Sequence, residues 1–395
     1  MKNTFLSLTL VAALFASCGE DDTADIIIND NSVTNNNGGP TTGSQTIELT
    51  GNQTADLTLD AANEYLVTGP LIMEDGTTLR IPAGVTIKAA ATGADVYVAI
   101  SQGAKIEANG TASTPIIFTS ASNTPNAGDW GGLILLGKAP INSVVGGDAT
   151  STSEIASLPY GGSASDDNSG ILRYVRVEYS GGKADGQSEN NGISFYGVGN
   201  GTLVEYLQAY EGKDDGVEFF GGTVNVDFLA VINAEDDSID WTEGYTGNIT
   251  NAYVKHGADH DKGIEADGFN TDIGNNANPK FYSKPTVTNL TIVGLGSGTE
   301  NEAIRLRAGT QGIFTNVVLE GFAEGFDLDG DTGDSPTGAG VLSGDLKVNS
   351  VLFTDITLNM KNDTGATFTE ADFLTIDAAA TGTDFATWGA NWARQ

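Results

Sequence analysis

Six short segments of the chain share one pattern: Asn191-Gly-Ile-Ser-Phe195, Asp215-Gly-Val-Glu-Phe219, Asp237-Ser-Ile-Asp-Trp241, Lys262-Gly-Ile-Glu-Ala266, Glu302-Ala-Ile-Arg-Leu306 and Glu324-Gly-Phe-Asp-Leu328. They align without gaps, and their central apolar residues are 24, 22, 25, 40 and 22 positions apart. A second pair of apolar residues precedes three of these centres by 11 positions, at Tyr206-Leu207, Phe228-Leu229 and Tyr253-Val254. Two strands at a constant offset indicate one structural turn per repeat.

The repeat predicts an all-β chain folded as a right-handed parallel β-helix. A unit of 22 to 25 residues with three short strands and no helix is typical of that solenoid. The spacing of 40 is interpreted as one turn plus an insertion within residues 269–285. Earlier turns are expected at residues 78–88, 104–110 and 115–120, where apolar and polar residues alternate.

Other repeat folds fit less well. A leucine-rich repeat has a similar period but needs a ladder of Leu and Asn that this chain lacks. A β-propeller requires about 40 residues per blade. A β-sandwich predicts no column of equivalent apolar residues, and it ranks second.

The two ends of the solenoid have different predicted structures. The β-helix is expected over residues 46–368, and residues 369–395 are expected to form a C-terminal cap, because open strand edges need covering. The cap is predicted from four large apolar residues at near-helical spacing, which are Phe373, Phe385, Trp388 and Trp392.

The N-terminus has the pattern of an exported protein. Residues 1–17 contain Lys2 and an apolar stretch from Phe5 to Phe15, which suits a secretory signal peptide and is too short to cross a bilayer. The only Cys of the chain, Cys18, follows at the expected cleavage position. Residues 18–45 are rich in Asn, Thr and Gly, a composition that predicts a flexible tether.

Residues Phe15-Ala16-Ser17-Cys18 resemble the lipobox of bacterial lipoproteins. The resemblance implies a diacylated Cys18 and attachment to the outer membrane; the alternative is an ordinary secretory signal followed by a chance Cys. The acidic cluster Gly19-Glu-Asp-Asp22 looks like the export signal of surface lipoproteins of the Bacteroidota. It implies display on the cell surface, with the periplasmic face as the alternative.

The composition excludes several classes of protein. The formal net charge is −34, from 52 Asp and Glu against 18 Lys and Arg. Such a charge disfavours binding to nucleic acid or to anionic lipid headgroups. A single Cys excludes an internal disulfide. The sequence also lacks a phosphate-binding Gly-x-x-x-x-Gly-Lys loop, a His-Glu-x-x-His motif and a Gly-x-Ser-x-Gly elbow, which removes the commonest nucleotide-using and hydrolase classes.

Several segments are similar to β-helical surface lipoproteins of the Bacteroidota, a largely uncharacterised family whose fold is pectate-lyase-like. The most specific is Gly128-Asp-Trp-Gly-Gly-Leu-Ile-Leu135, accompanied by Ile81-Pro-Ala-Gly-Val-Thr-Ile87 and residues 139–142 and 170–182. The resemblance covers roughly residues 65–395. It implies architecture and location in the cell envelope, and it transfers no catalytic residues.

A column of charged residues is expected on the outer face of the repeats. The residue between two buried positions must face outward, which gives Glu218, Asp240, Glu265, Arg305 and Asp327. Stacked carboxylates repel one another unless a cation lies beside them. Arg305 is interpreted as the member of the column that relieves this repulsion.

Ca²⁺ is the predicted cofactor, because hard divalent cations prefer several oxygen ligands. The alternative is a hydrated acidic face, since Asp and Gly also favour turns. The candidate ligands come from the column and from the turns before each strand; they are Asp214, Asp215, Glu218, Asp236, Asp237, Asp240, Asp259, Asp261 and Glu265.

Two functions are compatible with this pattern. The first is a non-enzymatic binding module of the outer membrane that contacts a glycan, a nutrient or a protein partner such as an outer-membrane transporter. Phe220, Tyr196 and Tyr245 are candidates to stack on sugars, or else they are buried. The second is a Ca²⁺-dependent polysaccharide lyase or glycosidase, whose basic residues would be Lys262, Arg305 and Arg307. The sequence leaves the oligomeric state open.

Two further motifs are interpreted as structural. His256 and His260 lie four residues apart, but on a strand and its following turn, where their side chains need not converge on Zn²⁺. Residues 329–334 alternate Asp with Gly and Thr, yet they lack the closing Glu of a Ca²⁺-binding loop, which favours a simple turn.

Overall fold

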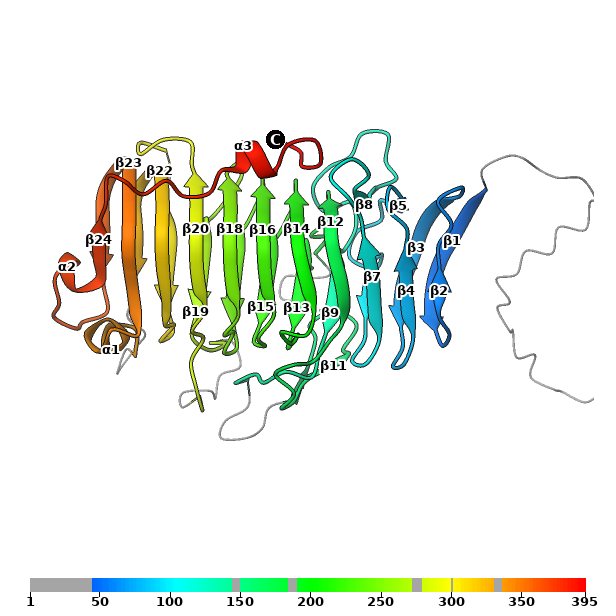
Figure 1. Cartoon of the computed structure of the whole chain (residues 1–395), viewed down its shortest axis with the longest axis horizontal. Coiled ribbons are helices and arrows are strands. Elements are labelled where there is room, and N and C mark those ends of the chain that lie inside the picture. Colours follow the sequence, from blue (N-terminus) through cyan, green and yellow to red (C-terminus); the bar gives the residue numbers. More distant parts are fainter. Residues whose placement is uncertain (1–44, 144–149, 184–189, 272–278, 300, 330–335) are drawn as a thin grey trace, which may run out of the picture. The chain divides into compact units, whose positions relative to one another are not determined.

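The computed structural model describes residues 45–143, 150–183, 190–271, 279–299, 301–329 and 336–395. The described residues from 45 onward form one compact unit, in which 22 of the described strands belong to one sheet with parallel pairing. Successive coils lie side by side along the solenoid (Figure 1). The chain therefore folds as a right-handed parallel β-helix, as predicted.

Most strands of the first coils are short; β1, with 8 residues, and β3, with 10 residues, are the exceptions. The early turns predicted from the sequence are confirmed as β4, β5, β7 and β8. The strands of this part are β1 (Thr46–Gln53), β2 (Leu57–Thr58), β3 (Glu64–Met73), β4 (Thr78–Ile81), β5 (Thr86–Ala89), β6 (Val98–Ile100), β7 (Lys105–Asn109), β8 (Ile116–Ser120) and β9 (Leu133–Leu136).

From residue 170 onward, short strands alternate with long ones. The short strands are β13 (Ile193–Tyr196), β15 (Val217–Phe220), β17 (Ile239–Thr242), β19 (Ile264–Asp267) and β21 (Glu302–Arg307). The long strands are β12 (Gly170–Glu178), β14 (Leu203–Tyr210), β16 (Asn225–Ile232), β18 (Asn248–Lys255), β20 (Thr286–Val293), β22 (Gly312–Leu328) and β23 (Leu346–Asn362).

The long strands β12, β14, β16, β18, β20 and β22 each bend at a residue in the left-handed backbone region, so that each supplies at least two sides of a coil. These residues stack from coil to coil, and they are Tyr174, Tyr206, Phe228, Asn251, Asn289 and Asn316, with φ between 49° and 59°. The three Asn side chains form a ladder: Asn289 Nδ2 donates to Asn251 Oδ1 at 2.8 Å and Asn316 Nδ2 donates to Asn289 Oδ1 at 2.7 Å. Asn tolerates this conformation better than most residues.

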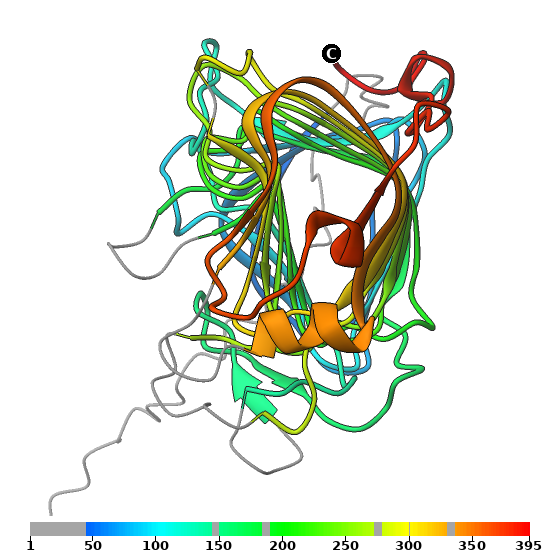
Figure 2. The ribbon, with the colours of Figure 1, turned by 90° about the vertical axis from the view of Figure 1, so that its left-hand side faces the viewer.

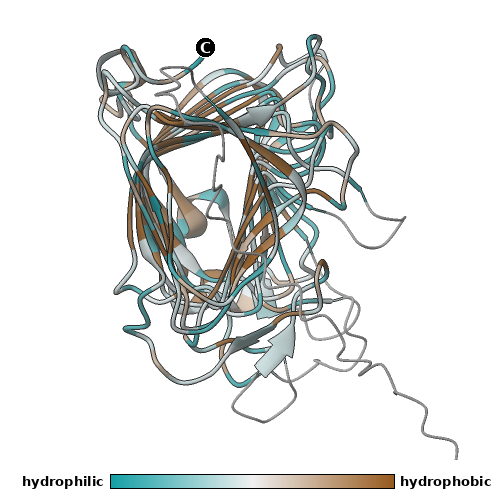
Figure 3. Cartoon of the chain, turned by 90° about the vertical axis from the view of Figure 1, so that its right-hand side faces the viewer, coloured by the Kyte–Doolittle hydropathy of each residue, from teal (hydrophilic) through white to brown (hydrophobic). Residues whose placement is uncertain are grey.

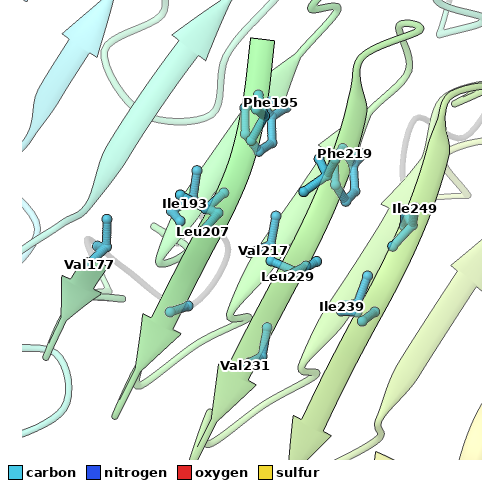
Figure 4. Close-up of a cluster of buried hydrophobic side chains, with 14 of the residues drawn as sticks. Val177, Ile193, Phe195, Leu207, Val217, Phe219, Leu229, Val231, Ile239 and Ile249 are labelled. Atoms are coloured by element: carbon cyan, nitrogen blue, oxygen red, sulfur yellow. The ribbon is translucent and has the colours of Figure 1, made fainter. Parts of the chain in front are cut away.

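The core is a set of apolar columns inside the coils. The central residues of the six repeats pair in register and are fully buried; they are Ile193, Val217, Ile239, Ile264, Ile304 and Phe326. Figure 4 shows Ile193, Val217 and Ile239 beside Leu207 and Leu229 of the long strands. Figure 2 and Figure 3, which look along the solenoid, show successive coils overlying one another around this interior.

The predicted alignment of the second strand is wrong in one coil. Leu207 pairs with Leu229 as expected, but Leu229 pairs with Ala252 and not with Val254. The reason is the length of one turn: eight residues separate β18 from β19, whereas six separate β16 from β17. The prediction counted 11 residues back from each short strand. Because the turn between β18 and β19 is two residues longer, that count reaches Tyr253-Val254, two residues beyond the true equivalents in β18.

Two insertions leave the regular coil. The predicted one separates β19 from β20, between Asp267 and Thr286, and its residues 272–278 lie outside the described part of the chain. The second was not predicted. It lies between β9 and β12 and contains the antiparallel hairpin of β10 (Thr150–Thr152) and β11 (Pro159–Gly161), which lies outside the coils (Figure 1).

Residues 369–395, expected to form one C-terminal cap, divide into two parts. Helix α2 (Glu370–Phe373) and β24 (Leu374–Ile376) cover the end of the solenoid together with the earlier helix α1 (Pro336–Ser343), and the residues that follow β24 run along its side (Figure 1, Figure 2). Phe373 is fully buried there, with its ring 5.3 Å from that of Phe326. The other predicted cap residues lie elsewhere, because the chain turns back along the side of the coils.

We call residues 380–395 the strap; they include α3 (Phe385–Trp388). The strap runs back over the bent strands (Figure 1). Trp392 is fully buried, with its ring 5.6 Å from that of Tyr174, and the ring of Trp388 lies 5.5 Å from that of Phe228. Arg394 Nη1 donates to Glu178 Oε2 at 3.2 Å.

The predicted signal peptide, Cys18 and most of the tether lie in residues 1–44, outside the described part of the chain. Within the described residues, no helix has the length and apolar character needed to span a membrane.

Candidate functional site: an acidic cleft

The outward residues of the short strands form two parallel columns, and the turns before these strands add a third set of side chains. The predicted column is confirmed in register, with Glu218 beside Asp240, Glu265, Arg305 and Asp327 in turn. Two residues further along each strand, a second column contains Tyr196, Phe220 and Thr242 and ends with Asp267 beside Arg307. The turns before the strands supply Asp215, Asp237 and Lys262 at equivalent positions of the repeat.

These columns line a cleft of about 1040 Å³. Its described lining includes Tyr160 and neighbours from the β10–β11 hairpin, and Asn270 and Thr271 from the loop after β19. Eleven carboxylates face three cations in this lining. The carboxylates are Glu154, Asp214, Asp215, Glu218, Asp236, Asp237, Asp240, Glu243, Asp261, Glu265 and Asp267.

Eight of the nine candidate metal ligands lie in the cleft. In four groups of three carboxylates, one oxygen from each residue lies within 4.8 Å of the others. Asp259 is the exception: it is exposed and lies in neither the lining nor any of these groups. The four groups are Asp214, Asp215 and Asp236; Asp215, Glu218 and Asp240; Asp236, Asp237 and Asp261; and Asp237, Asp240 and Glu265.

The three cations of the described lining, Lys262, Arg305 and Arg307, occupy the part of the cleft toward β21. Lys262 Nζ lies 2.5 Å from Asp261 Oδ2, 3.2 Å from Glu265 Oε1 and 3.7 Å from Asp237 Oδ1. Arg307 pairs with Glu265 and Asp267, and Arg305 pairs with Asp329. The confirmed position of Arg305 between Glu265 and Asp327 fits its predicted role as a residue that relieves repulsion.

At the opposite end, Lys183 Nζ lies 3.7 Å from Asp214 Oδ2, but no described cation pairs with the three carboxylates between these ends. We call Asp215, Glu218 and Asp240 the open triad. Asp215 Oδ1 accepts from the backbone N–H of Asp237 at 3.0 Å, and Glu218 Oε2 accepts from Asn191 Nδ2 at 2.6 Å. The side chain of Asp240 has no hydrogen bond or ion pair to any described residue, while its backbone pairs with the neighbouring strands.

Burial and mutual repulsion raise the pKa of all three carboxyls of the open triad. Desolvation is the largest cause in each, followed by the charge of Asp240 on Asp215, of Asp215 on Glu218 and of Glu218 on Asp240. Desolvation also raises the pKa of Asp237. The ligand-free cleft is therefore electrostatically unfavourable when all its carboxyls are ionised.

Glu243 belongs to the cleft but was not identified from the sequence. It is 1% exposed and has a left-handed backbone, with φ 53°. Its Oε2 accepts from Ser143 Oγ at 2.6 Å and from the Tyr160 hydroxyl at 2.7 Å, and its Oε1 accepts from Asn270 Nδ2 at 3.3 Å. Glu243 thereby ties both insertions to the coil.

The aromatic residues considered for sugar stacking are buried. Tyr196 is 2% exposed, Phe220 3% and Tyr245 0%. The rings of Tyr196 and Phe220 stack on each other at 4.0 Å, and Tyr245 stacks on Phe219 at 4.4 Å. Other rings of the protein already stack on these aromatic faces. The alternative expectation, that these residues are buried, is therefore confirmed.

The remaining sequence candidates lie outside the cleft lining. The rings of His256 and His260 stack at 4.4 Å, in a place with no carboxylate group that would complete a metal site among the described residues. Asp329 lies beside Asp327 and Asp363, and Lys361 pairs with both of the latter at 3.2 Å. Residues 330–334 of the predicted turn lie outside the described part of the chain.

Comparison with known proteins identifies the fold family. A family model described as a pectate-lyase-like β-helix domain matches residues 51–393. No curated protein matches the sequence. Among solved structures, the Dettilon tailspike protein is similar at 12% identity and a TM-score of 0.24, over 80% of this chain and 62% of the tailspike chain. The chain thus spans less than two thirds of that structure. The family match extends over most of the sequence, and the chain belongs to the family of proteins with a pectate-lyase-like β-helix domain.

Proposed function

We propose that this protein is a non-enzymatic binding module that uses its acidic cleft to hold Ca²⁺ at the open triad. One observation carries the proposal: three buried or half-buried carboxylates converge within 4.8 Å, while the described cations around the cleft pair with other carboxylates. The side chain of Asp240, one of the three, has no hydrogen bond or ion pair among the described residues. Such a cluster is favourable only with a cation beside it.

The chemistry of the donors fits a hard cation. Ca²⁺ takes six to eight oxygen ligands in a flexible shell. The open triad offers carboxylate oxygens, and Thr242, which lines the cleft beside Asp240, holds a buried hydroxyl with no hydrogen-bond partner among the described residues. Water or a bound ligand would complete the shell. Ca²⁺ would supply positive charge through which an oxygen-rich ligand can be held.

The geometry does not favour the lyase alternative. A base that takes a proton from a sugar must be unprotonated at the working pH. Desolvation opposes the charge on Lys262 and Arg307, but the carboxylates Asp237, Asp267 and Glu265 outweigh it, and the pKa values of both basic groups are raised. Both groups therefore stay protonated and paired.

Calcium binding is tested by thermal unfolding in EDTA and in millimolar Ca²⁺. A ligand of the native state present at 100 times its Kd stabilises it by about 2.7 kcal/mol. Asp240→Asn should abolish the difference, and the matched control Asp259→Asn, which removes the same charge outside the cleft, should keep it. Equal melting temperatures with and without Ca²⁺ in the wild type would contradict the calcium site.

The cellular part of the proposal is that a lipid on Cys18 anchors the module to the outer membrane and displays it on the cell surface. A transporter in the same membrane is the partner implied by the family resemblance. Support comes from the lipobox-like sequence and the acidic residues after Cys18. Metabolic labelling with a palmitate analogue should mark the wild type and not Cys18→Ser, and protease treatment of intact cells should remove the wild-type protein. Protection from the protease would place the module on the periplasmic face.

A further inference from the structure

One side-chain ammonium group of the protein, that of Lys262, lies in the cleft. Lys262 Nζ lies beside Asp237 and Glu265, at 3.7 and 3.2 Å. Together with Asp240, these two residues form one of the groups of convergent carboxylates. The cleft therefore already contains one primary ammonium, that of Lys262, bound between carboxylates of neighbouring coils.

One coil earlier, the same arrangement recurs without its ammonium. In register, Asp240 corresponds to Glu265 and Glu218 corresponds to Asp240. Asp215 takes the position of Asp237, so the open triad is equivalent to Asp237, Asp240 and Glu265. The residue equivalent to Lys262 in this coil is Asp237, which brings another carboxylate in place of a cation.

The donors of an ammonium match the acceptors of the open triad. A primary ammonium has three N–H donors and no acceptor, and three carboxylates converge at this place. Hydrogen bonds between ionised partners are the strong ones. An independent feature points to a ligand: Thr242 lines the cleft, is 6% exposed, and its hydroxyl has no partner among the described residues.

The volume of the cleft indicates a ligand larger than a single ion or water molecule. Its volume of about 1040 Å³ far exceeds that of a single water, which is about 30 Å³. A second group of carboxylates, formed by Asp214, Asp215 and Asp236, shares Asp215 with the open triad. Two neighbouring anionic groups in one cleft suit a ligand with two cationic groups, the second of which would share Asp214 with Lys183, whose Nζ lies 3.7 Å from Asp214 Oδ2.

We propose that the cleft binds an aliphatic oligoamine, with one primary ammonium at the open triad in the place equivalent to Lys262 Nζ and a second near Asp214 and Asp236. The proposal rests on the proposed function only in taking this cleft as the binding site. The ammonium and Ca²⁺ use the same carboxylates, so the two cations compete.

Isothermal titration of the full chain with spermidine, in EDTA and about 150 mM salt, tests the proposal. We expect one strong site, at least tenfold weaker in Asp240→Asn and changed less than twofold in Asp259→Asn. A bis-quaternary diamine of similar length keeps the charge but has no N–H donors, and it should fail to displace spermidine. Equal binding of that analogue, or equal loss in both variants, would overturn the proposal. Circular dichroism checks that Asp240→Asn is folded.

Titration of Ca²⁺ against the spermidine complex separates this proposal from the previous one. Competition between the two supports both. Binding of Ca²⁺ without any binding of spermidine overturns the oligoamine and leaves the calcium site intact. Binding of spermidine that Ca²⁺ does not affect supports the oligoamine and overturns the calcium site, whereas the absence of both overturns the cleft as a cation site.

Discussion

Asp240 lies between two other carboxylates, Glu218 and Glu265, in neighbouring coils. Adjacent strands are about 4.8 Å apart, and two unit charges at that distance repel by about 3.5 kcal/mol at an effective dielectric constant of 20. The side chain of Glu265 is neutralised by Arg307 and Lys262, and that of Glu218 has no cationic partner among the described residues. The repulsion is therefore concentrated at one residue.

Removing the charge of Asp240 should stabilise the ligand-free protein at neutral pH. Because its pKa is raised in the folded state, the wild type binds more protons when folded, and this contribution to stability is lost as pH rises from about 4 through the raised pKa. Asp240→Asn does not titrate, so we expect it to be more stable by about 1 kcal/mol or more at pH 8 and to lose this advantage near pH 4.

Urea denaturation in EDTA at both pH values measures the difference. Asp259→Asn is the control, since an exposed carboxylate should give nearly the same small effect at both. An Asp240→Asn protein that is less stable than the wild type at pH 8 would contradict the interpretation of the cluster.

Lys262 allows the complementary test, in which a paired ammonium is removed from the cleft instead of an unpaired carboxylate. Its side chain is 5% exposed, and removing one partner from a buried ionic group costs about 3–5 kcal/mol. We expect Lys262→Ala to lose stability of this order and to regain part of it in ethylammonium chloride, which can occupy the vacated position.

Thermal unfolding with and without the added amine measures the recovery. Lys213→Ala is the control, because the side chain of Lys213 is 49% exposed, and sodium chloride at the same concentration controls for ionic strength. Recovery by sodium chloride alone would show that the position does not recognise an ammonium.

At the scale of the element, the bends of the long strands depend on side chains as well as on backbone pairing. Asn289 both donates to Asn251 and accepts from Asn316, and its φ is 57°. A net hydrogen bond contributes about 1 kcal/mol, and the left-handed conformation costs a residue with a Cβ about 1–2 kcal/mol. The ladder and the bend are therefore coupled at one position.

Asn289→Ala should consequently destabilise the protein by about 2–3 kcal/mol. Asn289→Gly loses the same hydrogen bonds but accepts positive φ without strain, so it should cost about 1 kcal/mol less than Ala. Chemical denaturation of both variants measures the two contributions. Equal losses would show that the backbone conformation contributes nothing measurable at this bend.

The sequence predicted the short strands well because each has its own copy of the repeat. Val217, Ile239 and Ile264 occupy one interior column, and Glu218, Asp240 and Glu265 follow directly from it. The hairpin of β10 and β11 has no counterpart in the other described coils. The repeat of the sequence therefore could not predict it. Glu243 was missed for the same reason: its partners, Ser143, Tyr160 and Asn270, come from the two insertions.

At the scale of the whole molecule, the strap fastens the C-terminus to coils formed much earlier in the chain. Of the four aromatic residues at near-helical spacing, three are buried and Trp388 is half-buried. The partners of Phe385, Trp388 and Trp392 lie in β12, β14, β16 and β18, which local spacing does not reveal. Trp392 packs against both Tyr174 and Tyr206. The strap therefore covers an aromatic column on the outside of the solenoid.

Trp392→Ala should destabilise the protein by about 3–5 kcal/mol, the usual cost of truncating a fully buried aromatic residue. The strap should then be cleaved by protease while the coils resist, because the coils keep their own pairing. Mass spectrometry of the digest locates the first cuts. Cleavage first within the coils between β14 and β18 would show that the strap does not act as a separate layer.

In most solenoids each coil needs only its neighbours, and folding can spread along the chain as it appears. Here Arg394 reaches Glu178 across 216 positions of sequence, and contacts of that separation form late because their loop-closure entropy must be met first. The strap follows in the sequence the coils that it covers, so the aromatic column of Tyr174 and Tyr206 stays uncovered until residues 380–395 have been synthesised and have docked.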